Sequence, residues 1–446
     1  MHWMARRSEW TQPGDDARTA FDVDYARIIH SGSFRRLQGK TQILNLGDSD
    51  FYRNRLTHSL EVAQIATSLV RQFRQDNRDQ PVFDHLPEDS LIQVLGYTHD
   101  LGHPPFGHGG EVALNYCMRD HGGFEGNGQT LRILARLEKM SGNEGADLTR
   151  RALLGILKYP IPFSKAHNTV RAPRLLDGPS VVRLIDRDQS KPPKCYLNTE
   201  QDVVDWILAP LSAKDRKTFY ALSTKKGQHS RARHKSFDCS IMDLADDISY
   251  GVHDFEDAIA LGLIDQDAFK AAVDDVACAS FLDFLKEKYP NQYGNNIYDK
   301  FVDQLFADGN TRKHTISRMV GFLINNAQIV EKRGFVEPLL RYQARMNAGP
   351  EKFLKALKDF IFDSVIKSPN VQHLEFKGQT MVVSVFETFA SEPKSFLPSD
   401  AYALFEKSGE DMRVICDHIA GMTDAFLMKT YDRLFSPRMG SVFDRL

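Results

Sequence analysis

The chain has 446 residues, of which 42% are hydrophobic and 26% charged, values that are ordinary for a globular protein. Its formal net charge of −2 gives no general attraction to nucleic acid or to a membrane surface. It contains no apolar run of about 18 residues, no apolar N-terminal signal segment and no Cys-X-X-Cys pair among its five cysteines, so we expect a cytoplasmic protein without membrane spans or a cysteine metal site.

Helical periodicity dominates the chain, because apolar residues recur at intervals of three and four in most segments. In chain order, this pattern predicts helices over residues 58–73, 111–118, 129–137, 243–259, 353–366 and 412–435. Residues 376–386 are the most ambiguous segment, since their apolar residues also resemble a strand. The predicted fold class is therefore all-α.

Residues 160–240 are the least regular part and carry seven prolines, so we interpret them as an excursion from the helical body. This excursion contains a basic cluster: Lys225, Lys226, His229, Arg231, Arg233, His234 and Lys235. The favoured interpretation of such a charge run is a solvated loop. The alternative is a patch that binds phosphates or nucleic acid.

The pair His99-Asp100 joins a nitrogen ligand to an oxygen ligand at the expected end of a helix, just before Pro104 and Pro105 break it. One such pair is weak evidence, since His253-Asp254 also occurs. The case for a metal site needs partners elsewhere in the chain.

Candidate partners are His58, at the start of an amphipathic helix, and Asp246. On a helix, Asp246, Tyr250 and Asp254 share one face, which is typical of a lined pocket when apolar residues adjoin it. Two histidines and two aspartates favour Mn²⁺, Fe²⁺, Ni²⁺, Co²⁺ or Zn²⁺, with Mg²⁺ less favoured by the imidazoles.

These residues resemble a known family. His58, His99-Asp100 and Asp246 match the H…HD…D signature of HD-domain phosphohydrolases. The wider segments closely resemble deoxyguanosinetriphosphate triphosphohydrolases and their relatives; they are residues 34–42, 55–59, 99–111, 245–250 and 421–435. The resemblance implies one helical body over residues 1–446, with an HD core at about 50–260, the excursion at 160–240 and a helical C-terminal region at 300–446.

The resemblance also implies a role for each matching residue. The metal ligands would be His58, His99, Asp100 and Asp246, the last preferred to Asp247 because Tyr250 follows it by four residues. His108 and Glu111 match the catalytic pair, and His103, where some members carry Asn, would be an accessory acid or phosphate contact. The phosphate contacts would be Arg55, Lys158 and Tyr159. Gln42 would hydrogen-bond the sugar 3′-hydroxyl, Tyr250 would pack against the deoxyribose and disfavour a 2′-hydroxyl, and Asp254 would help to hold the sugar or an adjoining residue. Outside the resemblance, His108 could be a helix cap and Tyr250 a core residue.

The resemblance implies that a divalent metal (Mn, Mg, Co, Ni, Fe or Zn) supports hydrolysis of a deoxynucleoside triphosphate, dGTP or several dNTPs, to deoxynucleoside and triphosphate. It also implies a homo-oligomer, and a hexamer is expected. One alternative is an HD phosphodiesterase that acts on another nucleotide. The other is a nucleotide-sensing regulator that binds single-stranded DNA through the basic cluster.

Overall fold

The computed structural model describes residues 2–42, 53–142, 144–177, 184–293 and 295–437. Within these ranges helices dominate, which confirms the all-α fold class. The strands found there form two short antiparallel pairs, β1 (Leu222–Ser223) with β2 (Arg231–Ala232) and β3 (Ala327–Glu331) with β4 (Tyr342–Met346). Residues 50–52 of the expected HD core, 178–183 of the excursion and 438–446 of the C-terminal region lie outside the described residues.

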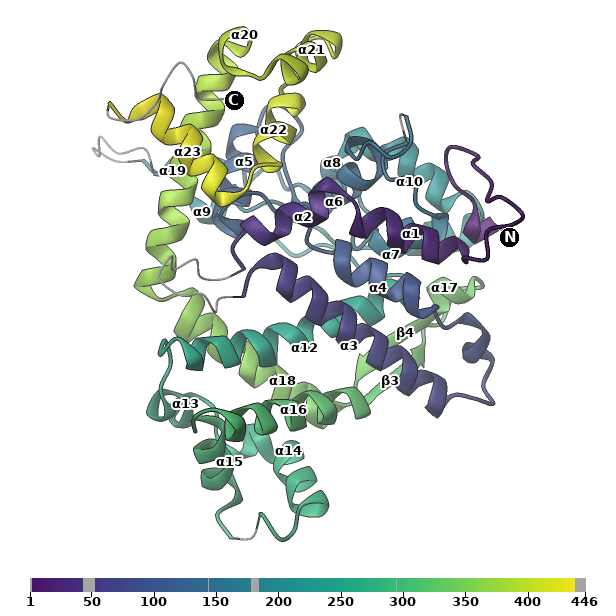
Figure 1. Cartoon of the computed structure of the whole chain (residues 1–446), viewed down its shortest axis with the longest axis vertical. Helices are drawn as coiled ribbons and strands as arrows, with labels where there is room; N and C mark the ends of the chain where they lie inside the picture. Colours follow the sequence, from purple (N-terminus) through teal and green to yellow (C-terminus); the bar gives the residue numbers. More distant parts are fainter. Residues whose placement is uncertain (1, 43–52, 143, 178–183, 294, 438–446) are drawn as a thin grey trace.

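Three helices pack together at the centre of the molecule: α3 (Arg55–Asp76), α4 (Asp89–Thr98) and α12 (Phe237–Ala260) (Figure 1). Asn54 begins α3 by accepting a hydrogen bond from the Thr57 amide, and Ser236 caps α12 in the same way. At Gly96 an added Cβ would lie 2.6 Å from the Ala63 Cα, so a residue without a side chain lets α4 cross close to α3.

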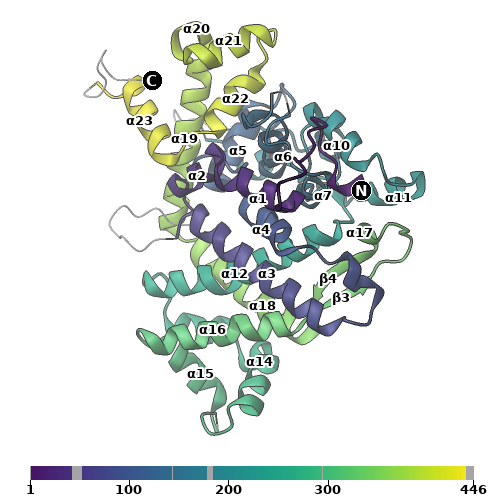
Figure 2. The same cartoon turned by 45° about the vertical axis from the view of Figure 1, so that its right-hand side comes forward.

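The buried apolar residues form two main clusters. The larger one includes α3, α4, α12, α1 (Ala20–Ile29), α7 (Arg150–Ile156), α10 (Gln201–Leu208), α14 (Asp275–Lys288), α15 (Ile297–Leu305), α16 (Asn310–Asn325) and α18 (Ala348–Ile361). The smaller one includes α5 (Gly107–Cys117), α19 (Pro369–Ser391), α21 (Ser399–Lys407), α22 (Met412–Ala420) and α23 (Asp424–Phe435). Figures 1 and 2 place α14–α16 at one end of the molecule and α20 (Pro393–Phe396), α21 and α22 at the other. Residues 99–106 connect α4 in the larger cluster to α5 in the smaller one.

The ambiguous segment 376–386 is helical and lies inside α19. Its buried residues Met381, Val382, Val385 and Phe386 face α5 and the C-terminal helices, so their spacing is that of one helix face. The single helix predicted over 412–435 is two helices, because the chain turns at residues 421–423 before Thr423 caps α23.

The excursion at 160–240 is less irregular than its prolines indicate. It contains α8 (Phe163–Ala166), α9 (Arg187–Ser190), α10, α11 (Ala213–Phe219) and the β1–β2 pair. Across the described ranges, no helix combines the length and the apolar character needed to cross a membrane.

Candidate active site

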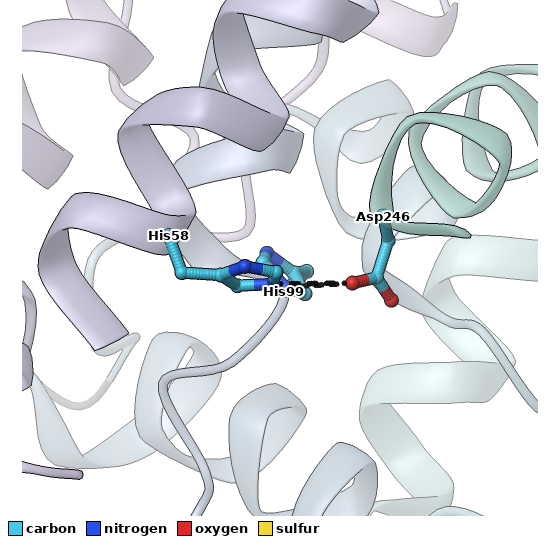
Figure 3. Close-up of side chains that lie close together, drawn as sticks. All are labelled: His58, His99 and Asp246. Carbon is cyan, nitrogen blue, oxygen red and sulfur yellow. Dashed lines mark hydrogen bonds and ion pairs between the residues drawn. The ribbon is translucent and has the colours of Figure 1, made fainter. Parts of the chain in front are cut away.

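Three side chains converge from the three central helices. His58 lies in the first turn of α3, His99 directly follows α4, and Asp246 lies near the middle of α12 (Figure 3). The Asp246 Oδ1 atom is 3.3 Å from His58 Nε2 and 3.6 Å from His99 Nε2. One ligand atom from each residue lies within 4.8 Å of the others, a spacing that suits a single metal ion.

The two imidazole rings are oriented by contacts on their far sides. His99 Nδ1 lies 2.7 Å from the Gly96 carbonyl oxygen, so it carries the proton and donates it there. The His99 Nε2 lone pair therefore faces the group, where this buried atom has no hydrogen-bond partner. Behind His58, Nδ1 lies 3.5 Å from Ser249 Oγ and 3.9 Å from Asp254 Oδ1. Such supporting contacts are typical of metal-binding histidines.

The charges around the group favour cation binding. Burial opposes ionisation of Asp246, but the nearby Lys158, His99 and His58 outweigh it and hold the pKa of this carboxyl below its usual range. Burial likewise lowers the pKa of an imidazole, but the hydrogen bond with Asp246 and the charge of Asp254 outweigh it and raise the pKa of His58 to about 9. In the absence of a metal, a proton on His58 balances these carboxylates.

Asp100, the fourth predicted ligand, lies beside the three but has other partners. Its Oδ1 is 3.5 Å from His99 Nε2 and 3.1 Å from His103 Nδ1, while Oδ2 accepts a hydrogen bond from Arg55 Nη1. Burial raises the pKa of such a carboxyl, but His103, His99 and Arg55 outweigh it and keep the pKa well below its usual range. Asp100 is thus an anion within reach of the group.

His108 and Glu111 form the predicted pair on the first turns of α5. His108 Nδ1 lies 3.2 Å from Glu111 Oε2, and the His108 side chain is 68% exposed whereas that of Glu111 is 5% exposed. The His103 ring packs edge-on against the His108 ring, with their centroids 5.4 Å apart. His108 can therefore exchange a proton with a bound molecule through Nε2 while Glu111 fixes its Nδ1 side.

The sequence analysis missed the residues that support Glu111. Its Oε1 accepts a hydrogen bond from the Gly126 amide at 2.9 Å and lies 3.3 Å from Lys194 Nζ. Lys194 also contacts Glu125 Oε1 at 2.9 Å. Burial raises the pKa of Glu111, but Lys194 and His108 outweigh it and hold the pKa well below its usual range. Lys194 comes from the proline-rich excursion, where no local pattern signals such a role.

Lys158 approaches the group from the side of α12. Its Nζ lies 2.9 Å from Asp243 Oδ1 and 3.4 Å from Asp246 Oδ2. Lys235, the last residue of the basic cluster, also contacts Asp243, and its Nζ lies 5.6 Å from the centre of the Tyr159 ring. Lys235, which the sequence places in the basic cluster, is therefore a second cation beside the predicted phosphate contacts Lys158 and Tyr159.

Tyr250 and Asp254 follow Asp246 at successive turns of α12, as the helix spacing predicts. Tyr250 is half-buried and packs against the larger apolar cluster. Asp254 is buried, and neither carboxylate oxygen has a hydrogen-bond partner, so its clearest contact is with His58. Gln42 follows Thr41, which forms a bridge with Asn54 at the start of α3, and its Oε1 is buried without a partner.

The rest of the basic cluster is divided between surface and interior. Lys225, Lys226, Arg231 and Arg233 are exposed on or beside the β1–β2 pair. His229 is held in place, since its Nδ1 accepts from the Asn168 amide at 2.9 Å and its Nε2 lies 3.1 Å from the Lys191 carbonyl oxygen. The positive charge that this cluster presents to solvent therefore comes from its two exposed lysines and two exposed arginines.

The helical core and its histidine–aspartate group define an HD-domain phosphohydrolase. Residues 55–158 match the model of the HD domain, and residues 344–433 match that of the phosphohydrolase-associated domain. The first range includes His58 and His99, and the second includes α19, α22 and most of α23. HD domains bind divalent metals, which agrees with the grouping of His58, His99 and Asp246.

Relatives of nearly the same length narrow this class. A deoxyguanosinetriphosphate triphosphohydrolase-like protein of Shewanella halifaxensis is 44% identical over 99% of this chain and 98% of its own length. Proteins of that name from Shewanella sediminis, and with the suffix 2 from Deinococcus radiodurans, are each 42% identical with the same coverage. The chain belongs to the deoxyguanosinetriphosphate triphosphohydrolase-like family.

Proposed function

We propose that the protein hydrolyses a deoxynucleoside triphosphate, dGTP or several dNTPs, to a deoxynucleoside and inorganic triphosphate. The observation that supports this most is the position of the His108–Glu111 pair beside the group formed by His58, His99 and Asp246. The relatives' names support the substrate class. The product pattern requires water to add to the α-phosphorus while the bond from that phosphorus to the 5′-oxygen breaks.

A divalent metal fits the donor set, because His99 Nε2 is a buried nitrogen without a partner and the Asp246 carboxylate faces it. His58, His99 and Asp246 would hold the ion, with Asp100 as the fourth ligand, and Mn, Co, Ni, Fe, Zn or Mg would serve. When bound, such an ion supplies charge stabilisation for a phosphoryl oxygen and lowers the pKa of a water molecule.

The chain's own residues would perform the remaining tasks. Arg55 and Lys158, each now paired with an aspartate, would exchange part of that pairing for phosphate oxygens. His108 would move a proton through Nε2, as the acid that protonates the leaving 5′-oxygen or as the base for the attacking water. Glu111 would hold the Nδ1 proton, Gln42 would hydrogen-bond the sugar 3′-hydroxyl, and Tyr250 would pack against the sugar.

The test is to incubate the protein, with Mn²⁺, Co²⁺ or Mg²⁺, with each dNTP and with GTP, and to resolve the products by ion exchange. We expect deoxynucleoside and intact triphosphate from the wild type and neither from Asp246→Ala. His108→Ala should keep its metal but lose about 10²- to 10⁴-fold in kcat, the usual contribution of a general acid or base.

Other products would contradict the proposal. Diphosphate or free phosphate would identify a different phosphohydrolase, and hydrolysis of a cyclic or tetraphosphate nucleotide would favour the phosphodiesterase alternative. If no dNTP is hydrolysed either alone or in mixtures, the protein is better described as a nucleotide sensor.

A further inference from the structure

The turn between α22 and α23 is buried against two segments of the candidate active site. Asp424, the first residue of α23, is 0% exposed. Its Oδ2 accepts hydrogen bonds from the Thr41 amide at 2.9 Å and from the Thr41 hydroxyl, and its Oδ1 accepts one from the Phe106 amide at 2.9 Å. One carboxylate from the C-terminal region thus holds two segments that are distant in the sequence.

A buried lysine makes a second link between the same parts. Lys40 Nζ donates to the Ala420 carbonyl at 2.9 Å and to the His103 carbonyl at 2.6 Å. The turn also approaches closely at Gly39, where an added Cβ would lie 2.7 Å from Thr423 Cγ2. The contact between residues 39–41 and the C-terminal turn therefore leaves no room for a shifted arrangement.

The two held segments adjoin predicted catalytic and sugar-binding residues. Thr41 directly precedes Gln42, and Phe106 lies two residues before His108. Phe106 has φ 60°, a left-handed conformation that is unfavourable for a residue with a side chain. Such a conformation persists only when its surroundings hold it, and here the Asp424 carboxylate binds the Phe106 amide.

We propose that Asp424 is a positioning residue that sets Gln42 and His108 relative to each other, so that the C-terminal region completes the nucleotide site. The inference rests on the proposed function, in which Gln42 contacts the sugar 3′-hydroxyl and His108 transfers a proton. If so, the turn between α22 and α23 contributes to the choice of sugar, although it is far from the metal group in the sequence.

The chemistry of the contact requires a carboxylate. Asp424 accepts from three donors, and both of its oxygens are used. An asparagine has one acceptor oxygen, and its NH₂ group would meet an N–H or O–H donor on the other side. Asp424→Asn should therefore release either Thr41 or Phe106 while keeping nearly the same size and shape.

The experiment compares kcat/KM for a dNTP and its 2′,3′-dideoxy analogue, together with thermal stability. In Asp424→Asn we expect kcat/KM for the dNTP to fall by about 10²-fold, the usual effect of a misplaced catalytic group. We also expect the preference for the 3′-hydroxyl to fall about tenfold, the value of one lost hydrogen bond. A residue that only stabilises the fold would lower stability without changing this preference.

Asp411→Asn is the matched control, because Asp411 caps α22 in the same region by accepting from the Arg413 amide and is exposed. Its preference should equal that of the wild type. Thr41→Val tests the contact from the other side if Asp424→Asn does not fold: it should lower the preference, and Thr41→Ser, which keeps the hydroxyl, should restore it.

The inference is overturned if Asp424→Asn and Thr41→Val keep the wild-type preference, whatever their stability, or if the wild type hydrolyses dNTPs without any such preference. If the wild type hydrolyses no dNTP, the proposed function fails on its own. The positioning role is then judged by amide exchange: faster exchange in Asp424→Asn confined to residues 39–42 and 103–110 supports it, and unchanged exchange there rejects it.

Discussion

The chemistry of the candidate site depends on which nitrogen of each histidine is available. Because His99 donates from Nδ1 to the Gly96 carbonyl within its own helix end, the backbone of α4 fixes the tautomer. His58 has no such carbonyl and depends on Asp254 and Ser249 instead. The two ligands are therefore oriented by different means, and only the second can be altered by side-chain substitution.

This difference leads to a prediction for Asp254. Asp254→Asn removes the negative charge behind His58 Nδ1 and should weaken metal binding by about 10- to 100-fold, as the loss of a supporting contact commonly does. Titration of the metal-free protein with Mn²⁺ or Co²⁺ in a calorimeter measures the effect. Asp257→Asn is the control, since Asp257 lies three residues further along α12 and pairs with Arg53. Equal affinities of Asp254→Asn and the wild type would show that Asp254 does not support His58.

Single residues were predictable where a short motif surrounds them. His58, His99, Asp246, His108 and Glu111 all stand in such motifs, and the structure brings them into two adjacent groups. Lys194 and Asp424 reach the site through contacts across 83 and 318 residues, respectively, which no local spacing encodes. Asp254 was assigned to the sugar or an adjoining residue that the sequence did not identify, and in the structure its Oδ1 lies 3.9 Å from His58 Nδ1.

Among the elements, long amphipathic helices were predictable and their interruptions were not. The face of α19 was ambiguous because residues 376–386 contain adjacent valines that also suit a strand, and only packing against α5 decides it. The break between α22 and α23 was also not predictable from the pattern, since Thr423 continues the helical spacing but caps a new helix. This turn also lies close to Gly39, where an added Cβ would be 2.7 Å from Thr423 Cγ2.

The Lys40 link gives a prediction on pH and stability. Burial lowers the pKa of Lys40 from 10.5 to about 7, and the neutral amine still has two N–H groups for its two carbonyl acceptors. Between pH 7 and the unfolded value the unfolded chain binds more protons, so this residue's contribution to the free energy of unfolding increases as pH rises. Relative to Lys40→Met, the wild type should gain about 1 kcal/mol per pH unit over this range.

Denaturant unfolding of both proteins at pH 7, 8 and 9 measures this difference. The Met side chain keeps most of the buried volume, so its constant effect on stability cancels when the pH dependences are compared. Parallel curves for the two proteins would mean that Lys40 stays charged in the folded state.

In the whole molecule, the site draws on both apolar clusters, since His58 and Asp246 come from helices of the larger one and the His108–Glu111 pair comes from α5 in the smaller one. Short motifs in the chain could indicate the metal group but not this division, because the division arises from how α19 packs on α5 and how α22 and α23 pack on α19. The proline-rich segment 160–240, interpreted as an excursion from the helical body, supplies Lys194 to Glu111 and carries an exposed basic surface.

That surface tests the DNA-binding alternative. If residues 225–233 bind single-stranded DNA, the double variant Lys225→Glu/Lys226→Glu should bind more weakly, and the salt dependence of log K should decrease by about 0.7 for each lost phosphate contact. Fluorescence anisotropy with a labelled oligonucleotide at several salt concentrations measures both. The exposed residues Lys286 and Lys313 provide a control double variant of equal charge change. No binding by the wild type at low salt would remove this function.

The hydrogen bond from the Phe106 amide to Asp424 also has a consequence for folding during synthesis. A chain leaves the ribosome N-terminus first, and its earlier parts can fold before its later ones. The proposed metal ligands His58, His99 and Asp246 all precede α22 and α23, and Asp424 lies 318 residues after Phe106. A growing chain would thus contain the proposed cation ligands before it can hold the proposed sugar contact in place, and we expect activity to begin only when the last two helices dock.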